Sequence, residues 1–299
     1  MQSSSVESVP QNAKDHVNLL ILGAGWTSTF LIPLLEREGI KYAATTTTGR
    51  DGTIPFKFDP QLSDPALYKT LPSADTVLIV FPLRGQGQSK HLVQMYESTH
   101  KTVEGHKFHF VQLGATTIWT ASTWHDENSP YELSDARAIA EDELMLCSQG
   151  AVLNLAGLYG GVRHPRDWLD RVINTKAQLK GKGALHVIHG DDLARAIVAF
   201  HRNFTPGKRW LLSDMHVYDW WDLAQDWAVQ TLRGAKSGDF DVPADKIEIQ
   251  KELLAWVGEL MVEQGVRALP RDTSSLGRTL DGRGFWKKMG IWPTHGRIK

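Results

Sequence analysis

The sequence predicts an α/β protein with a doubly wound parallel sheet and a smaller substrate lobe in its C-terminal half. Segments of strand length and helix length alternate along most of the chain, as expected where crossover helices join parallel strands. The run DTVLIVF, residues 75–81, is almost continuously apolar, which is typical of a parallel strand covered on both faces. A Gly-Ala-Gly turn directly follows the first apolar run, NLLIL.

Each element is expected from its own pattern of apolar residues. Strands are predicted over residues 17–22, 42–46, 75–81, 107–113, 151–156, 186–188 and 210–212. Helices are predicted over residues 27–38, 89–98, 134–147, 219–232 and 251–263, and another ends near residue 201. Residues 1–14 are expected to be a disordered tail. Residues 15–160 would form the nucleotide-binding region, and residues 161–299 mostly the substrate lobe, with residues 184–213 returning to the sheet.

Composition narrows the classes of function. A net charge of -1 does not suggest a basic surface for nucleic acid or for an anionic membrane. Cys147 is the single cysteine, so no intramolecular disulfide can form, which fits a reducing compartment. The polar N-terminus lacks the apolar core of a secretory signal. We therefore expect a cytoplasmic monomer or homodimer whose partner is a small-molecule substrate.

The turn GAGWTS, residues 23–28, predicts a Rossmann-type dinucleotide site. Gly23 permits a tight turn, and Gly25 lets the backbone come close to a pyrophosphate. The following helix offers free amides and the positive end of its dipole. Ser28 stands where G-x-G-x-x-G has its third glycine, and it is small enough to pack closely. Trp26 and Thr27 complete the predicted turn, in which the hydroxyls of Thr27 and Ser28 could donate to phosphate.

The segment TTTTGR, residues 45–50, bears on the choice of nucleotide. NAD-binding proteins usually carry a carboxylate at the end of the second strand, whereas the first one here is Asp51. The hydroxyl of Thr48 and the guanidinium of Arg50 suit a 2′-phosphate, because a guanidinium donates paired hydrogen bonds. The sequence thus favours NADP over NAD, the alternative being a solvated surface arginine. Phe81 and Pro82, which end a later strand, are expected beside the nicotinamide ribose.

Several segments together resemble the atypical extended short-chain dehydrogenase/reductase superfamily, which is related to NAD(P)-dependent epimerases and dehydratases. Besides the glycine turn they are VQLGATTIW (residues 111–119), DE (126–127), LAGLYG (155–160), HGDDLA (189–194) and KKMGIWP (287–293). Their order and spacing span nearly the whole chain. The resemblance implies a nicotinamide cofactor and oxidoreductase or epimerase/dehydratase-like chemistry.

The sequence departs from this superfamily in its catalytic Tyr-x-x-x-Lys pair. An alignment on Glu141 puts Leu133 at the tyrosine position and Arg137 at the lysine position. An alignment on Tyr131 instead puts Asp135, of the wrong charge, at the lysine position. Loss of the pair matches the atypical branch, whose members keep the fold and the glycine turn.

Four side chains are the candidates for catalysis: Thr116, Tyr131, Arg137 and His164. Arg137 could bind the nicotinamide ribose, but its guanidinium is a poor proton donor. The other three could move a proton to or from a substrate oxygen, and the segment RHPR, residues 163–166, could clamp an anionic group.

The leading interpretation is an NADP-dependent oxidoreductase acting on a small carbonyl or alcohol substrate. The alternatives are a non-catalytic NADP-binding sensor or scaffold, and a non-redox isomerase or cyclase. We expect no metal site, because His186 and His189 have no further ligands at metal-binding spacing. Asp191 and Asp192 are expected to cap and charge the start of a helix.

Overall fold

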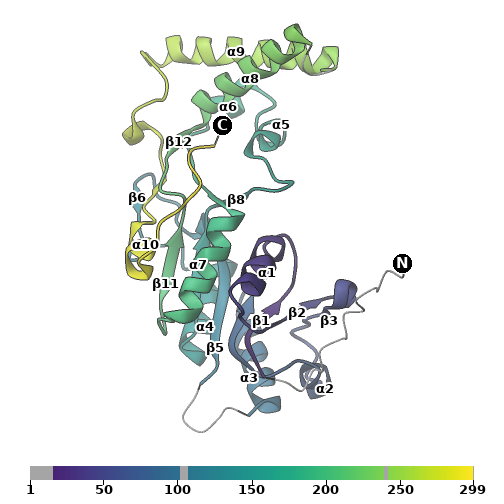
Figure 1. Cartoon of the computed structure of the whole chain (residues 1–299). Coiled ribbons are helices and arrows are strands. Elements are labelled where there is room, and N and C mark those ends of the chain that lie inside the picture. Colours follow the sequence, from purple (N-terminus) through teal and green to yellow (C-terminus); the bar gives the residue numbers. More distant parts are fainter. Residues whose placement is uncertain (1–15, 102–106, 239–241, 299) are drawn as a thin grey trace, which may run out of the picture. The chain divides into compact units, whose positions relative to one another are not determined.

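The computed structural model describes residues 16–101, 107–238 and 242–298 (Figure 1). The chain divides into two compact units. Unit 1 comprises Met1–Ile118, Glu132–Asn154 and Leu193–Trp210, and unit 2 comprises Trp119–Tyr131, Leu155–Asp192 and Leu211–Lys299. The chain therefore passes between the units several times. The sequence predicted a main boundary near residue 160 and one return to the sheet over residues 184–213. The tail predicted over residues 1–14 lies outside the described residues.

Unit 1 contains nearly all of a seven-stranded sheet with the order β11-β7-β5-β4-β1-β2-β3. Its strands are β1 (Val17–Leu22), β2 (Tyr42–Thr46), β3 (Ile54–Pro55), β4 (Ala74–Ile79), β5 (His109–Ala115), β7 (Ala151–Leu155) and β11 (Arg209–Leu212). The pairs β1–β2, β1–β4, β2–β3 and β4–β5 are parallel. The predicted Rossmann-type α/β class is confirmed. The strand order changes direction at β1, which is the point where open parallel sheets bind ligands.

Helices cover both faces of this sheet. They are α1 (Ser28–Arg37), α2 (Pro65–Lys69), α3 (Gln88–Thr99), α4 (Ala136–Ser148) and α7 (Gly190–Arg202). Helix α3 packs against α4 on the side to which Val77 points. The residue before Val77 on β4, Thr76, has a side chain that is hydrogen-bonded to His201 of α7 at 2.8 Å. Because successive strand residues point to opposite faces, α7 lies on the other side of the sheet from α3 and α4.

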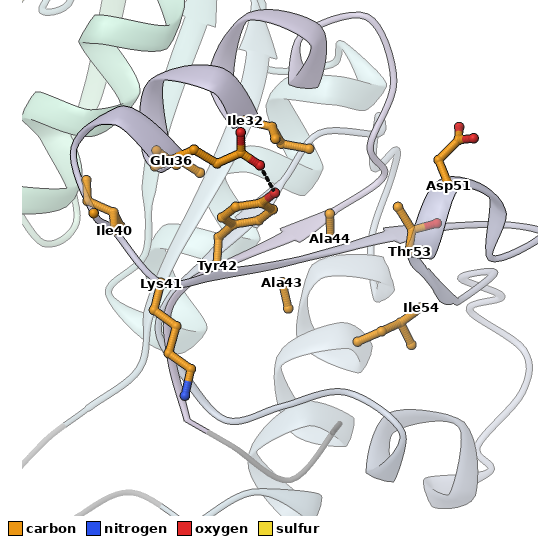
Figure 2. Close-up of a pocket in the computed structure, with 13 residues that line it drawn as sticks. Ile32, Glu36, Ile40, Lys41, Tyr42, Ala43, Ala44, Asp51, Thr53 and Ile54 are labelled. Atoms are coloured by element: carbon orange, nitrogen blue, oxygen red, sulfur yellow. Dashed lines mark hydrogen bonds between the residues drawn. The ribbon is translucent and has the colours of Figure 1, made fainter. Parts of the chain in front are cut away.

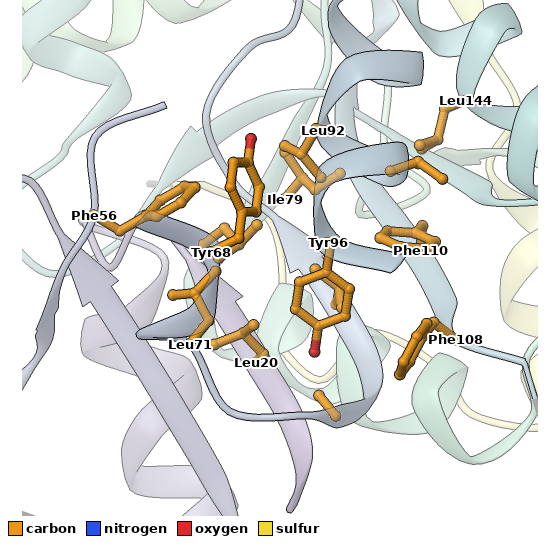
Figure 3. Packing of buried hydrophobic residues seen from close by; sticks show 14 of the residues in the cluster. Leu20, Phe56, Tyr68, Leu71, Ile79, Leu92, Tyr96, Phe108, Phe110 and Leu144 are labelled. Carbon is orange, nitrogen blue, oxygen red and sulfur yellow. The ribbon is translucent and has the colours of Figure 1, made fainter. Parts of the chain in front are cut away.

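The core between the sheet and α3–α4 is rich in aromatic side chains (Figure 3). Leu20 and Ile79 of the strands face Tyr96 of α3 and Leu144 of α4, and all four are fully buried. The hydroxyl of Tyr96 donates to the carbonyl of Pro72 at 2.9 Å, so its polar end is satisfied inside the core. Each such side chain stabilises the fold by about 1.5–3 kcal/mol.

Unit 2 combines three short strand pairs with a helical layer. Strands β8 (Gly157–Tyr159) and β10 (Val187–His189) are parallel, β9 (Ala184–Leu185) and β12 (Tyr218–Asp219) antiparallel, and β6 (Trp124–His125) and β13 (Thr279–Leu280) parallel. The helices are α5 (Leu169–Val172), α6 (Lys176–Lys180), α8 (Trp220–Ser237), α9 (Ala244–Glu263) and α10 (Arg283–Met289). Helices α8 and α9 pack through Trp221, Trp227 and Val257.

Two predicted segments differ from the structure in ways that affect the site. The strand predicted over residues 186–188 does not join the large sheet, because it is β10 and pairs with β8. The helix predicted over residues 134–147 begins two residues later, as α4, because Asp135 caps it. The Oδ1 of Asp135 accepts from the amides of Arg137 at 2.7 Å and Ala138 at 3.3 Å.

Within the described ranges, no helix is long and apolar enough to cross a membrane.

Candidate functional site

The glycine turn after β1 is fixed from two sides. Gly23 has φ +95°, a left-handed conformation that favours glycine, and its amide donates to Thr45 Oγ1 at 3.0 Å. The amide of Ala24 donates to the carbonyl of Thr45 at 2.6 Å. A Cβ on Gly23 would lie 3.2 Å from Cδ1 of Phe81. The sequence prediction missed Thr45 as a support of this turn, although it lies in the threonine run that ends β2.

The outer side of the turn is open. A Cβ on Gly25 would meet no atom within 4 Å. Helix α1 starts immediately afterwards, its N-cap Thr27 makes no side-chain capping bond, and its first turn holds no acidic side chain. Trp26 packs edge-on against Phe30 of α1, with ring centroids 4.9 Å apart. Open backbone and a helix N-terminus without an acidic neighbour are together suited to an anionic group.

The side chains of Thr27 and Ser28 point into the protein. Both are buried, and Ser28 Oγ has no hydrogen-bond partner among the described residues. The prediction that the Ser28 hydroxyl donates to phosphate therefore does not fit this geometry. Ser28 instead occupies the place of the third glycine, whose usual role is close helix–strand packing.

Arg50 lies just beyond the carboxyl end of β2. Thr46 Oγ1 accepts from the amides of Gly49 at 3.0 Å and Arg50 at 3.2 Å, and it is hydrogen-bonded to Thr53 Oγ1 at 2.8 Å. Arg50 begins the short 3-10 helix η1 (Arg50–Gly52). Its side chain is 65% exposed, and its Nε lies 3.9 Å from Oδ2 of the exposed Asp51. The backbone is thus fixed while the guanidinium stays accessible.

The other predicted cofactor residues surround these elements. Thr48 is exposed in the loop between β2 and η1. Phe81 follows β4, where its ring stacks on Phe58 with centroids 5.5 Å apart. The carbonyl of Phe81 accepts from Gln112 Nε2 at 3.3 Å, and the neighbouring Pro82 is exposed. The contact between Phe81 and the glycine turn brings together two segments that the sequence assigned to one site.

Arg137 lies in the first turn of α4 and reaches the end of β5. Its Nη2 donates to the carbonyl of Leu113 at 3.2 Å, while its Nε is buried with no partner within the described part of the chain. Burial lowers the pKa of Arg137; the charge of Glu141 raises it, and that of Arg84 lowers it further. Thr116, which is buried, starts the 3-10 helix η2 (Thr116–Ile118) just after β5.

The tyrosine position of the expected catalytic pair is not on the helix. Leu133 precedes the cap of α4 and is 68% exposed, so Leu133 and Arg137 do not share a helical face. The alignment on Glu141 thus assigns the tyrosine position to a residue outside the helix. The reason is local, because the side chain of Asp135 takes the first amides and the helix starts after it.

Tyr131 and His164 belong to unit 2. Tyr131 is half-buried, and His164 is exposed just before the 3-10 helix η3 (Pro165–Trp168). Arg166, expected to be part of an anion clamp, donates instead to Thr231 Oγ1 and to the carbonyl of Trp227, the latter at 3.3 Å. Since its guanidinium holds η3 against α8, the prediction of a clamp that includes Arg166 is wrong.

A separate groove of about 600 Å³ runs beside α1, β2 and η1 (Figure 2). Its walls include Ile32, Tyr42 and Ile54. The hydroxyl of Tyr42 donates to Glu36 Oε1 at 2.8 Å, and burial together with this carboxylate raises the pKa of Tyr42 to about 12. None of the predicted cofactor residues lines this groove, so it is distinct from the glycine turn.

No protein-family model and no curated protein matches the chain. Solved structures do match over nearly its whole length. Vestitone reductase from alfalfa superposes with a TM-score of 0.58 at 14% identity, over 94% of each chain. A human epimerase family protein with NADPH gives 0.57 at 13% identity, over 94% of this chain and 96% of that one. The dTDP-glucose 4,6-dehydratase from Bacillus anthracis with NAD gives 0.55 at 10%, over 93% and 92%.

The chain has the Rossmann-like fold of short-chain dehydrogenase/reductase structures. The resemblance of the sequence segments to this superfamily is thereby confirmed at the level of fold. Reductases, epimerases and dehydratases all appear among these structures. Because one fold carries several activities, the function has to be argued from the residues of the site.

Proposed function

We propose that the protein is an NADP-dependent oxidoreductase of the short-chain dehydrogenase/reductase type that acts on a small carbonyl or alcohol substrate. The observation that carries the nucleotide preference is Arg50, an exposed guanidinium held just beyond β2. A guanidinium binds phosphate through paired, charge-assisted hydrogen bonds. The end of β2 carries threonines where NAD-binding proteins usually have a carboxylate, so nothing in residues 45–49 would repel a 2′-phosphate.

The residues present fit a dinucleotide. Gly25 and the start of α1 would receive the pyrophosphate, Thr48 and Arg50 the 2′-phosphate, and Phe81 and Pro82 would border the nicotinamide half. When bound, the nicotinamide supplies or accepts the hydride. The same elements would bind NADH less well, because the contacts of Arg50 with a 2′-phosphate would be missing.

The remaining candidates would act on the substrate. Arg137 stays charged, since arginine does not lose its proton in proteins, so its role would be to orient the ribose or the substrate. Thr116 follows the end of β5, the strand whose Leu113 carbonyl accepts from Arg137, and would hydrogen-bond the reacting oxygen. Tyr131 and His164 are the candidates for moving the proton.

The position of Leu133 favours a second candidate, an NADP-binding sensor without turnover. An exposed leucine stands where the superfamily carries its catalytic tyrosine, and it lies outside α4. In this alternative the glycine turn and Arg50 would still bind the nucleotide. A binding measurement and a turnover measurement are therefore both needed.

Titration of the purified chain with NADPH and NADH, followed by fluorescence, tests the nucleotide. We expect NADPH to bind at least about tenfold more tightly, a difference of about 1.4 kcal/mol. Arg50→Ala should remove that preference, while Arg37→Ala, at an exposed arginine in the last turn of α1, should leave it unchanged. Equal affinity for the two nucleotides, or an equal loss of both in Arg50→Ala, would contradict the proposal.

A panel of small aldehydes and ketones with NADPH then separates the two candidates. Oxidation of NADPH that depends on one carbonyl compound supports the oxidoreductase. Tight NADPH binding without consumption on any member of the panel supports the sensor.

A further inference from the structure

The first half of β2 has an open edge on its outer side. Strand β3 pairs only with the end of β2, through Thr45 with Ile54 and Thr46 with Pro55. Strand β1 covers residues 42–44 from the other side. Among the residues that the structure describes, no strand pairs with the outer side of residues 42–44. Such an edge carries backbone donors and acceptors with which another strand can pair.

The register of the sheet identifies the backbone groups at this edge. The amide of Leu19 in β1 donates to the carbonyl of Lys41 at 3.2 Å, so the odd-numbered residues of this stretch direct their backbone groups toward β1. The amide directly after β3 donates to the carbonyl of Thr46 at 2.8 Å, which places the even-numbered residues on the outer side. The amides of Tyr42 and Ala44 therefore face outward, before the pairing with β3 begins.

The groove of Figure 2 follows this open edge. Ile32 of α1 and Ile54 of β3 belong to its apolar walls, and Ala43 and Ala44 of β2 are part of its lining. The two alanines carry only methyl groups, which leaves space beside the strand for another backbone. A strand that paired with β2 would thus gain hydrogen bonds from the edge and cover apolar surface of the walls.

The two ends of this edge carry charges of opposite sign. Lys41 directly precedes β2, whereas Asp51 lies beyond its end, and both line the groove (Figure 2). The Asp51 side chain is 89% exposed. The remaining charged residue of the lining, Glu36, accepts from the hydroxyl of Tyr42. If a second β2 ran antiparallel to the first, each Lys41 would face the end of the other strand, where Asp51 lies. The edge is thus complementary to itself, as a two-fold interface requires.

We propose that the outer edge of β2 is the interface of a two-fold homodimer. Residues 42–44 of two copies would pair in the antiparallel direction, and Lys41 of each copy would contact Asp51 of the other. The charges favour a second copy of this chain over an unrelated peptide, because they match when the edge meets itself. The paired segment is short, so we expect a weak dimer with a dissociation constant on the order of 10 µM. The proposal does not rest on the proposed function, because the pairing involves neither the glycine turn nor a bound nucleotide.

Sedimentation velocity of the full chain tests the assembly over roughly 1–200 µM, a range that brackets the expected dissociation constant. We expect the dimer fraction to rise with concentration. Ala44→Pro removes an outward amide and leaves the bonds to β1 in place, and a strand tolerates proline at such a position, so this variant should be folded and monomeric. Ala43→Pro is its matched counterpart. It removes an amide that faces β1 and should lower the thermal midpoint, which circular dichroism measures.

Charge variants test the pairing without altering the backbone. Lys41→Glu and Asp51→Lys should each raise the dissociation constant of the dimer by about tenfold or more, because like charges then face each other. The double variant, which restores opposite charges, should recover the dimer. Lys69→Glu makes the same change at an exposed residue of α2 outside the groove and should have no effect. A parent that stays monomeric at about 200 µM, or a dimer that survives Ala44→Pro and both single charge variants, would overturn the proposal.

Discussion

Arg209 and Glu141 form an ion pair inside unit 1, where both side chains are almost fully buried. Asn154 completes the arrangement, because its Nδ2 donates to Glu141 Oε2 at 2.9 Å and its Oδ1 accepts from Arg209 Nη1 at 2.9 Å. Glu141 is the residue on which the sequence was aligned with the superfamily's catalytic helix. Its contacts tie α4 to β7 and β11, so its role is to fix the helix that carries Arg137.

Substitution of Glu141 by glutamine should lower the free energy of unfolding by about 3–5 kcal/mol, because it leaves the Arg209 charge buried without its main partner. Urea unfolding followed by circular dichroism measures this change. Asp142→Asn is the matched control. Asp142 also pairs with Arg209, at 2.8 Å, but its side chain is 29% exposed, so water partly replaces the lost contact and Asp142→Asn should cost less than Glu141→Gln. Equal losses of unfolding free energy in Glu141→Gln and Asp142→Asn would contradict a special role for the buried pair of Arg209 and Glu141.

Two glycine substitutions should separate folding from nucleotide binding. A Cβ on Gly114 would lie 2.5 Å from both Asn154 Nδ2 and Glu141 Oε1, so Gly114→Ala should destabilise the fold by roughly 1–3 kcal/mol. A Cβ on Gly25 meets no atom within 4 Å, so Gly25→Ala should change stability by less than about 0.5 kcal/mol.

For NADPH binding, the proposed cofactor site predicts that the two glycine variants rank in the opposite order, with Gly25→Ala the more strongly affected. Gly25→Ala should raise the Kd for NADPH by about tenfold or more, because the methyl group occupies space left for the pyrophosphate. The comparison uses thermal unfolding and NADPH titration on the same preparations. Unchanged NADPH affinity in Gly25→Ala would place the pyrophosphate elsewhere.

Asp51 should weaken the binding of a 2′-phosphate by Arg50. Its carboxylate lies 3.9 Å from Arg50 Nε and is 89% exposed, so it competes for the guanidinium and repels the phosphate. Asp51→Asn should therefore strengthen NADPH binding by a few-fold, an effect of about 0.5–1 kcal/mol for an exposed charge. NADH affinity should stay the same. Asparagine is a suitable replacement because the residue has φ +54°, which asparagine tolerates. Titrations at low salt give the clearest test, and an equal gain for NADH would contradict it.

His186 should make stability depend on pH. It is buried, its Nδ1 donates to the carbonyl of His216 at 3.1 Å, and its Nε2 accepts the amide of Leu280 at 3.1 Å. Burial and then the charge of Arg278 lower its pKa to about 4, from 6.5. Below pH 6.5 the unfolded chain takes up a proton that the folded chain excludes. Stability is therefore complete above pH 6.5 and falls as the pH drops to about 4, by up to roughly 3 kcal/mol.

Urea unfolding between pH 4 and pH 7.5 measures this dependence. Other histidines also titrate in this range, so the comparison is with His186→Gln. The parent should lose more stability than the variant as the pH falls. Parallel curves for the two proteins would show that His186 does not contribute.

Local patterns in the sequence predicted much of unit 1. The strands predicted over residues 17–22 and 42–46 are β1 and β2 as the structure has them. This works because apolar periodicity and glycine turns depend on neighbours in the chain. Arg50 was predicted from the threonine-rich end of β2 to contact a 2′-phosphate; its side chain is exposed there, and the contact stays a prediction. The start of α4 was missed by two residues, because its boundary depends on one side chain, Asp135, accepting backbone hydrogen bonds.

The sequence by itself thus determined the fold class, the glycine turn and the basic residue beyond β2. Only the tertiary structure decided which distant side chains meet: Thr45 with Gly23, Arg209 with Glu141, and His295 with His189 and Asp191. In the tertiary structure the Ser28 hydroxyl is buried, and Arg166 donates to the carbonyl of Trp227 in α8. The physical reason is that a buried polar group must be paired wherever packing places it, and packing depends on the whole chain.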